Sequence, residues 1–220
     1  MNIVAHDLKA PINRIYGLTH ILEREGNLTD KQLELVNLIK DCTSGGLDLI
    51  TGLLDVHALN ELKETPKPST VQFNQFLEEK VRAFSPVADS KGSQIQVSCA
   101  FDHPVICEPS YFGRILDNLL SNAIKFSPKN SSVCVSASWK DGSLGLSVKD
   151  NGPGFTDEDR KLLFQKFRKL SAQPTAGESS NGLGLAIVKK LVDRLGGSIE
   201  LNTSAKGSEF LIHIPAEAVK

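Results

Sequence analysis

Apolar residues recur every three or four positions along the first part of the chain. On a helical wheel of about 100° per residue, five of them lie within about 40° of one line: Val4, Leu8, Ile12, Ile15 and Leu22. This pattern predicts an amphipathic helix that ends near Gly26-Asn27. His6 lies at about 160° from the stripe, so we expect its side chain to face away from the core.

A second helix is expected to begin at Thr29 or Asp30, either of which can cap it. Its seam residues alternate in steps of four and three, as in a coiled coil: Leu35, Ile39, Cys42, Gly46, Leu49, Leu53 and Val56. Because two helices cannot enclose a core, we expect this helical hairpin to pair with a second copy in a four-helix bundle. Gly45 and Gly46 weaken the helix by roughly 1 kcal/mol each, and no reason for them is visible in the sequence.

A short linker is expected at residues 65–69, because Pro66 and Pro68 cannot continue a helix. The sign of the charge changes there as well. Six Lys or Arg stand against ten Asp or Glu before residue 67 (net −4), and nineteen stand against sixteen from residue 67 onward (net +3). We therefore expect two domains, residues 1–66 and 67–220.

After the linker, helical and strand periods alternate. Strands are expected near residues 71–73, 94–101, 133–139, 144–150, 198–201 and 209–214. Helices are expected near residues 74–89, 110–126 and 183–195, and Asn74 can cap the first of them. A loop-rich stretch is expected at residues 151–181. The predicted fold class is α+β: the helical hairpin is followed by an α/β sandwich in which helices cover one face of a mixed sheet.

Composition excludes several classes of protein. With 40% hydrophobic and 23% charged residues, the chain is typical of globular proteins. The net charge is −1 and no basic run alternates with aromatic residues, so nucleic acid is not expected as a partner. No stretch approaches the about 18 apolar residues that a membrane-spanning helix needs, and residues 1–7 lack the basic start and long apolar middle of a signal peptide. The cysteines form no Cys-x-x-Cys pair, which argues against a zinc site.

Three segments carry candidate chemistry. On the expected helix at 110–126, Asn118, Asn122 and Lys125 share one face, and this set suits a divalent cation and phosphate oxygens. Asp150, at the end of a strand, can accept a hydrogen bond from an amino group such as that of adenine, and Gly152 and Gly154 follow it. Another glycine pair, Gly182 and Gly184, opens a helix whose N–H groups can bind phosphates.

The order of these motifs resembles sensor histidine kinases, whose catalytic domain shares its fold with gyrase-type ATPases. Asn118-x-x-x-Asn122-x-x-Lys125-Phe126 is similar to the N box of that family, and Asp150-x-Gly152-x-Gly154 to its G1 box. The F box and the G2 box resemble the segments Phe164-x-x-Phe167-Arg168-Lys169 and Gly182-Leu183-Gly184-Leu185. Upstream, His6-Asp7-Leu8-Lys9-Ala10-Pro11 resembles the phospho-acceptor H box, so the likeness covers nearly the whole chain.

The resemblance implies that the γ-phosphoryl group of ATP passes to His6 and then to an aspartate of a response-regulator receiver domain. Asp7 would orient the imidazole and take up its proton. Asn122 would hold Mg²⁺ with help from Asn118, and Asp150 would bind adenine. Lys125, Arg168 and Lys169 would neutralise the charge of the phosphates. The glycines of the G2 box would let a lid close over them.

Two features depart from the family pattern. Ala10 stands where the family commonly has Thr or Asn to position a water, so we expect little phosphatase activity toward the regulator. The chain also begins five residues before His6, so we expect a longer receptor whose sensor, and any membrane anchor, lies upstream. The part with this sequence is expected to act in the cytoplasm as a homodimer.

Two alternatives stay open. A gyrase-type ATPase accounts for the nucleotide boxes but not for the segment His6–Pro11, and such enzymes commonly have Glu at the position of Asn118. A degenerate kinase domain that serves as a dimeric nucleotide-binding scaffold would be expected to have lost a box, and every box is present.

Overall fold

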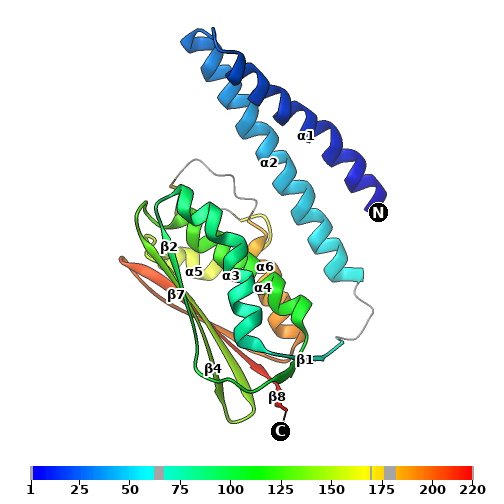
Figure 1. Cartoon of the computed structure of the whole chain (residues 1–220), viewed down its shortest axis with the longest axis vertical. Helices are drawn as coiled ribbons and strands as arrows, with labels where there is room; N and C mark the ends of the chain where they lie inside the picture. The colour runs from blue at the N-terminus through cyan, green and yellow to red at the C-terminus, as the bar shows by residue number, and fades with distance from the viewer. Residues whose placement is uncertain (1, 62–66, 169, 176–181, 220) are drawn as a thin grey trace.

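The computed structural model describes residues 2–61, 67–168, 170–175 and 182–219, with the backbone alone at 2–8, 48–49, 51 and 53–61. A long helical hairpin comes first, and a sheet with helices packed on one face comes second (Figure 1). The predicted α+β class, with a hairpin ahead of a sandwich, is therefore confirmed. Of the expected linker at residues 65–69, the first two residues lie outside the described residues, and Ser69 already begins a strand.

The hairpin consists of two antiparallel helices, α1 (Asn2–Glu25) and α2 (Asp30–Glu61). Gly26 and Asn27 have left-handed backbone angles, φ of 68° and 64°, which end α1 where the sequence predicts.

A reciprocal cap begins α2. The Gln32 N–H donates to Thr29 Oγ1 at 3.3 Å, and the Thr29 N–H donates to Gln32 Oε1 at 2.9 Å. Thr29, rather than Asp30, is therefore the capping residue.

Much of the hairpin's apolar surface is not covered within one chain. Among its described side chains, Val36, Thr19 and Thr43 are buried. Large apolar side chains along both helices are exposed: Ile15, Tyr16, Leu18, Ile21, Leu22, Leu33, Leu35, Leu38 and Ile39. A Cβ on Gly46 would lie 3.5 Å from Ile12 Cδ1, so this glycine lies where the two helices pack against each other.

The main sheet has five strands in the order β2-β4-β5-β7-β6. They are β2 (Gln94–Cys99), β4 (Ser132–Lys140), β5 (Ser143–Lys149), β7 (Gly207–Pro215) and β6 (Ser198–Ser204). Strands β2 and β4 pair in parallel and the other neighbours are antiparallel, so the sheet is mixed, as predicted. A small antiparallel sheet beside it has the order β1-β3-β8: β1 (Ser69–Val71), β3 (Val105–Cys107) and β8 (Glu217–Ala218).

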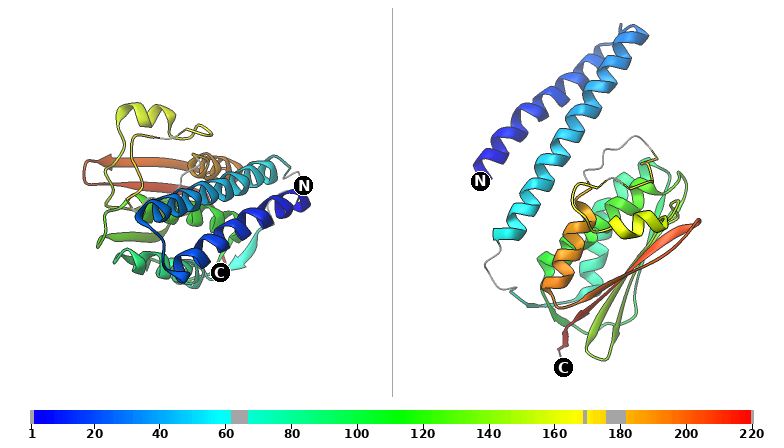
Figure 2. Two further views of the ribbon diagram at one scale, coloured as in Figure 1. Left: turned by 90° about the horizontal axis from the view of Figure 1, so that it is seen from above. Right: turned by 180° about the vertical axis from the view of Figure 1, so that it is seen from behind.

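Three helices cover one face of the main sheet: α3 (Phe73–Ser90), α4 (Pro109–Phe126) and α6 (Gly184–Arg194) (Figures 1 and 2). Strand β5 shows why: Leu144, Leu146 and Val148 are buried beneath the helices, and the residues between them are small or polar. Helix α4 contributes nine buried residues and so lies at the centre of the core.

Several local predictions were wrong. The strand expected at 71–73 ends at Val71, and Phe73 already belongs to α3, whose N-cap is Gln72 rather than Asn74. The stretch 151–181 contains a short helix, α5 (Asp157–Leu162), which begins with a capping box formed by Thr156 and Asp159. Strands β3 and β8 were not predicted, because two or three residues are too few to show a period.

Candidate nucleotide-binding site

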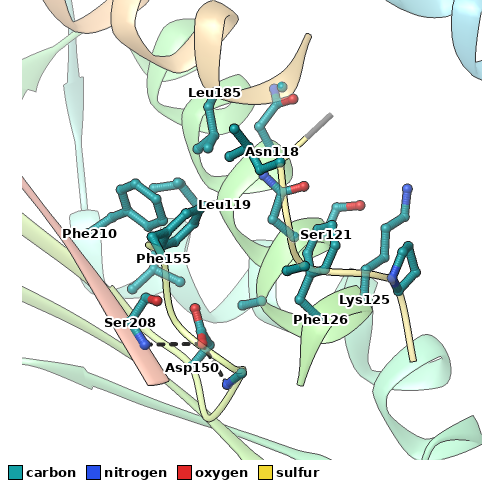
Figure 3. Close-up of a pocket in the computed structure, with 18 of the residues that line it drawn as sticks. Asn118, Leu119, Ser121, Lys125, Phe126, Asp150, Phe155, Leu185, Ser208 and Phe210 are labelled. Carbon is teal, nitrogen blue, oxygen red and sulfur yellow. Dashed lines mark hydrogen bonds between the residues drawn. The ribbon is translucent and has the colours of Figure 1, made fainter. Parts of the chain in front are cut away.

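A pocket of about 490 Å³ lies between α4, the loop after β5, the segment before α6 and the start of α6 (Figure 3). This volume suits a ligand the size of a nucleotide. The pocket brings together eleven of the residues that the sequence predicts to bind ATP: Asn118, Asn122, Lys125, Phe126, Asp150, Gly152, Gly154, Arg168, Gly182, Gly184 and Leu185. Segments far apart in the chain therefore form one site.

Helix α4 supplies the carboxamides. It is capped by Glu108, which accepts hydrogen bonds from the Ser110 N–H at 3.3 Å and hydroxyl at 2.7 Å. Asn118 Nδ2 donates to the Arg114 carbonyl at 2.7 Å, which fixes the amide plane. A Cβ on Gly184 would lie 3.0 Å from Asn118 Oδ1. The glycine that opens α6 therefore lies against the face of α4 that carries the Asn side chains.

Asp150 is held by two backbone N–H groups, those of Gly152 at 2.8 Å and Ser208 at 3.2 Å, and both donate to its Oδ1 (Figure 3). Within the described parts of the chain, Oδ2 has no partner and remains able to accept a hydrogen bond from a ligand. Burial raises the pKa of Asp150, although the hydrogen bonds from Gly152 and Ser208 oppose the shift.

The backbone conformation requires glycine at two positions of the pocket. Gly154 has a φ of 77°, and a Cβ there would collide with the Ser204 carbonyl oxygen. Gly182 has a φ of 65°, and a Cβ there would collide with the backbone of Arg168. The two loops consequently pack closer to their neighbours than any other residue would permit.

Three predicted residues are not among those that line the pocket. Leu183 is fully buried and packs in the core, and Phe164 is half-buried against the same core. Phe167 is 51% exposed, with a φ of 60°. These side chains thus support or flank the site rather than line it, and Lys169 lies outside the described residues.

The sequence does not predict the apolar part of the pocket or several of its polar residues, among them Ser208. Leu119, Phe155 and Phe210 form an apolar surface beside Asp150 (Figure 3). Ser208 lies next to Asp150 and is 4% exposed. One signal could have revealed it, because Ser208 is the polar member of the inward-facing positions of β7, where Phe210 and later alternate residues are apolar.

The hairpin reaches this pocket. Gly52 of α2 is buried and is one of the lining residues, and α2 contacts α6. His6 and Asp7 lie on α1, which packs along α2, but their side chains are outside the described residues. The helix pair that carries the candidate acceptor therefore borders the candidate nucleotide site.

Comparisons with known proteins agree with this arrangement. Residues 107–218 match the family "Histidine kinase-, DNA gyrase B-, and HSP90-like ATPase", and residues 1–61 match the "His Kinase A (phospho-acceptor) domain". The sensor histidine kinase GacS of Pseudomonas protegens is 29% identical over 96% of the chain, and the circadian input-output histidine kinase CikA of Thermosynechococcus vestitus 31% identical over 97%. The chain spans 24% and 30% of their respective lengths.

Solved structures show the same fold. Full-length ShkA, crystallised in complex with AMPPNP, superimposes with a TM-score of 0.73 and 26% identity, over 99% of this chain and 46% of that one. The Acinetobacter baumannii histidine kinase AdeS superimposes with a TM-score of 0.65 and 23% identity, over 96% and 97% of the two chains. The chain belongs to the sensor histidine kinases and combines a phospho-acceptor domain with an ATP-binding domain of the gyrase type.

Two further observations concern the described residues alone. None of their helices is long and apolar enough to cross a membrane. They contain no group of three His, Cys, Asp or Glu side chains placed to hold a metal ion. The pocket does offer carboxamide oxygens, and these suit Mg²⁺ when phosphate oxygens and waters complete its coordination.

Proposed function

We propose that this chain phosphorylates His6 with ATP and passes the phosphoryl group to an aspartate of a response-regulator receiver domain. One observation carries the proposal: the Asn pair, Asp150 and both glycine loops converge on one pocket, in a chain that also has a phospho-acceptor domain. We also propose that the reaction takes place in the cytoplasm, where ATP is available as the donor. A gyrase-type ATPase finds no support, because the phospho-acceptor domain is present.

Adenine is proposed to bind beside Asp150, with its amino group donating to the free Oδ2. The aromatic and aliphatic side chains of Leu119, Phe155 and Phe210 would cover the faces of the base. Leu119 and Phe210 are buried, and a hydrogen bond beside such apolar side chains discriminates strongly between bases.

The phosphates are proposed to lie toward Lys125, Arg168 and the start of α6, where backbone N–H groups favour anions. Asn122, assisted by Asn118, would hold Mg²⁺. The metal would neutralise charge on the phosphates when it is bound, as phosphoryl transfer through a loose transition state requires. Gly182 and Gly184 would allow the backbone to approach the phosphates.

His6 is the proposed acceptor, and Asp7 would orient its ring and take up the proton from the other nitrogen. An unperturbed histidine, with a pKa of about 6.5, is mostly neutral at pH 7 and so has a lone pair for attack. One turn further along α1, Ala10 has no polar atom to hold a water, which supports a kinase with little phosphatase activity.

Incubation with Mg-ATP tests the proposal directly. A phosphoryl group on a histidine nitrogen is lost in acid and survives base, so the phosphorylated chain is expected to lose its label at low pH. His6→Gln should acquire no such label while it binds ATP as the wild type does. An acid-labile label on His6→Gln would place the acceptor elsewhere, and release of inorganic phosphate without labelled protein would favour an ATPase.

A further inference from the structure

Lys91 is a buried lysine that the proposed reaction does not use. It is 6% exposed and lies at the end of α3, from which its ammonium reaches the end of α4. It donates to the carbonyl oxygens of Ile124 at 2.7 Å and Lys125 at 3.2 Å, and to Thr175 Oγ1 at 2.7 Å. Each of the three ammonium protons thus has an acceptor. A cation at this position also interacts favourably with the helix dipole.

Thr175 is attached to the same helix end by its own groups. Its backbone N–H donates to the Lys125 carbonyl at 3.0 Å. Its hydroxyl lies 2.7 Å from the Ser127 carbonyl oxygen and 3.1 Å from that of Lys125, and it accepts from Lys91. Hence Thr175 connects α3, α4 and the segment that precedes α6.

Ser171, four residues earlier, is attached at a second point. Its backbone N–H donates to Asp159 Oδ1 at 2.9 Å, and its hydroxyl donates to Asp159 Oδ2. Asp159 is 5% exposed and also belongs to the capping box of α5. Residues 171–175, which we name the strap, are therefore held at both ends. Between the two attachments, Ala172, Gln173 and Pro174 line the pocket.

The end of α4 contacts the adenine side of the pocket too. Ser127 Oγ accepts a hydrogen bond from the Asn151 N–H at 3.3 Å, directly after Asp150. The last turn of α4 thus contacts both the loop that carries Asp150 and the strap. A change at this helix end would move two walls of the pocket relative to each other.

We infer that Lys91 and Thr175 are positioning residues, which fasten the strap to the end of α4 so that one wall of the pocket is formed before the nucleotide arrives. The inference rests on the proposed function, because it takes the pocket to bind ATP. A wall that is already ordered raises affinity, since binding then costs less conformational entropy. Neither side chain needs to touch the nucleotide.

The test compares autophosphorylation by the full chain and six variants: Thr175→Val, Thr175→Ser, Lys91→Met, the double variant of Thr175→Val with Lys91→Met, and two controls. Thr175→Val removes the hydroxyl at nearly constant volume, and because Thr175 is exposed the core stays intact. Thr175→Ser retains the hydroxyl. Thr70→Val, on β1, and Lys140→Met, at the end of β4, are matched controls on exposed positions away from the strap. The KM for ATP, kcat and the melting temperature without nucleotide are measured for each.

We expect Thr175→Val to raise the KM for ATP about five- to tenfold, as the loss of one or two hydrogen bonds implies, with kcat within about twofold of wild type. Thr175→Ser should restore the KM, and the controls should match the wild type. Lys91→Met should raise the KM as well, and the double variant should raise it by less than the product of the two effects, because both release the same strap.

An unchanged KM in Thr175→Val, whether or not its melting temperature falls, would overturn the inference. Thr175 would then be a structural residue. Failure of the proposed function has a different outcome, since the wild type itself would then acquire no acid-labile label.

Discussion

The carboxylate of Asp150 serves the protein and the proposed ligand with different oxygens. Oδ1 accepts from Gly152 and Ser208, and Oδ2 faces no described partner. Asparagine at this position can keep the Oδ1 hydrogen bonds, and its amide nitrogen would replace the free acceptor by a donor. Because burial raises the pKa of the carboxyl group, its ionisation opposes folding above that pKa, and an uncharged replacement removes this cost.

Asp150→Asn is therefore expected to lose preference for ATP without losing stability. Affinity for ATP should fall by about 10²-fold or more, since sites built around a hydrogen bond reject mismatched partners by up to 10⁴ or more. Affinity for GTP should change far less. Thermal unfolding without nucleotide at pH 7 should occur at the same or a higher temperature. If the variant prefers ATP over GTP as strongly as the wild type does, Asp150 does not bind adenine.

The raised pKa of Asp150 predicts that the affinity for ATP depends on pH. Its raised pKa means that it becomes protonated at a higher pH than an ordinary aspartate, whose pKa is about 3.9. The affinity for ATP should be highest when the pH is well above the raised pKa, and it should decline as the pH falls through that pKa. The curve for Asp150→Asn serves as the baseline, because the nucleotide titrates identically with both proteins. Parallel curves for the two proteins would contradict the prediction.

Individual residues differ in how well the sequence indicates their roles. The glycines and carboxamides could be found because their spacing places them on one helix face or in one tight loop. Ser208 belongs to a strand distant in sequence from Asp150, and its contact depends on the β5–β7 register. Leu183 lies between the two glycines of the G2 box, where a contact with the ligand is expected. It directly precedes α6, and its side chain is fully buried in the core.

At the scale of elements, α5 is connected to the strap through one buried carboxylate. Burial alone would raise the pKa of Asp159, but hydrogen bonds from Ser171 and Thr156 outweigh it, and the pKa lies below its usual value. A carboxyl group whose pKa is lowered stabilises the fold above its unfolded pKa, and this contribution is lost as the pH falls through the folded pKa.

Asp159→Asn should consequently lower the melting temperature at pH 7 by about 2–4 °C. The difference from wild type should shrink below about pH 4, where the wild-type carboxyl group begins to lose its charge. Differential scanning calorimetry from pH 7 to pH 3 measures both effects. Asp157→Asn, exposed in the same helix turn, is the matched control. A difference that stays constant with pH would show that the charge of Asp159 does not matter.

Long elements were predicted well and short ones were not. Helix α4 and the β4–β5 hairpin have enough residues for a period to appear, and their predicted and observed bounds differ by at most one residue. Strands β1, β3 and β8 exist because they pair with each other, far apart in sequence, and local pattern does not contain that information.

For the whole molecule, the hairpin presents more apolar surface than its own two helices cover. Leu35 is 54% exposed, Leu38 59% and Ile39 42%. A shallow groove between the helices adds Ile12, Ile15 and Cys42 to this surface. Soluble monomers seldom expose apolar strips along several helical turns, so a second hairpin is the expected cover. The predicted seam residues Leu49, Leu53 and Val56 continue along α2, where their side chains are outside the described residues.

We therefore expect the chain to form a homodimer through residues 1–61, and Ile39→Asp to dissociate it. A charge in the buried seam would have to be desolvated in the dimer, whereas in the monomer it lies in water, so the substitution penalises only the dimer. Sedimentation velocity at micromolar concentration should show a dimer for the wild type and a monomer for the variant. Val87→Asp, at an exposed apolar position on α3, is the matched control and should remain dimeric.

The nucleotide pocket makes this test specific. Because the pocket lies mainly within the second unit, Ile39→Asp should bind ATP with wild-type affinity even as a monomer. An Ile39→Asp protein that stays dimeric would locate the interface outside this face of the hairpin. A monomer that has also lost ATP binding would show instead that the substitution disrupts the packing of α2 against the ATP-binding unit, and the dimer prediction would then have to be tested at Leu35, further from Gly52.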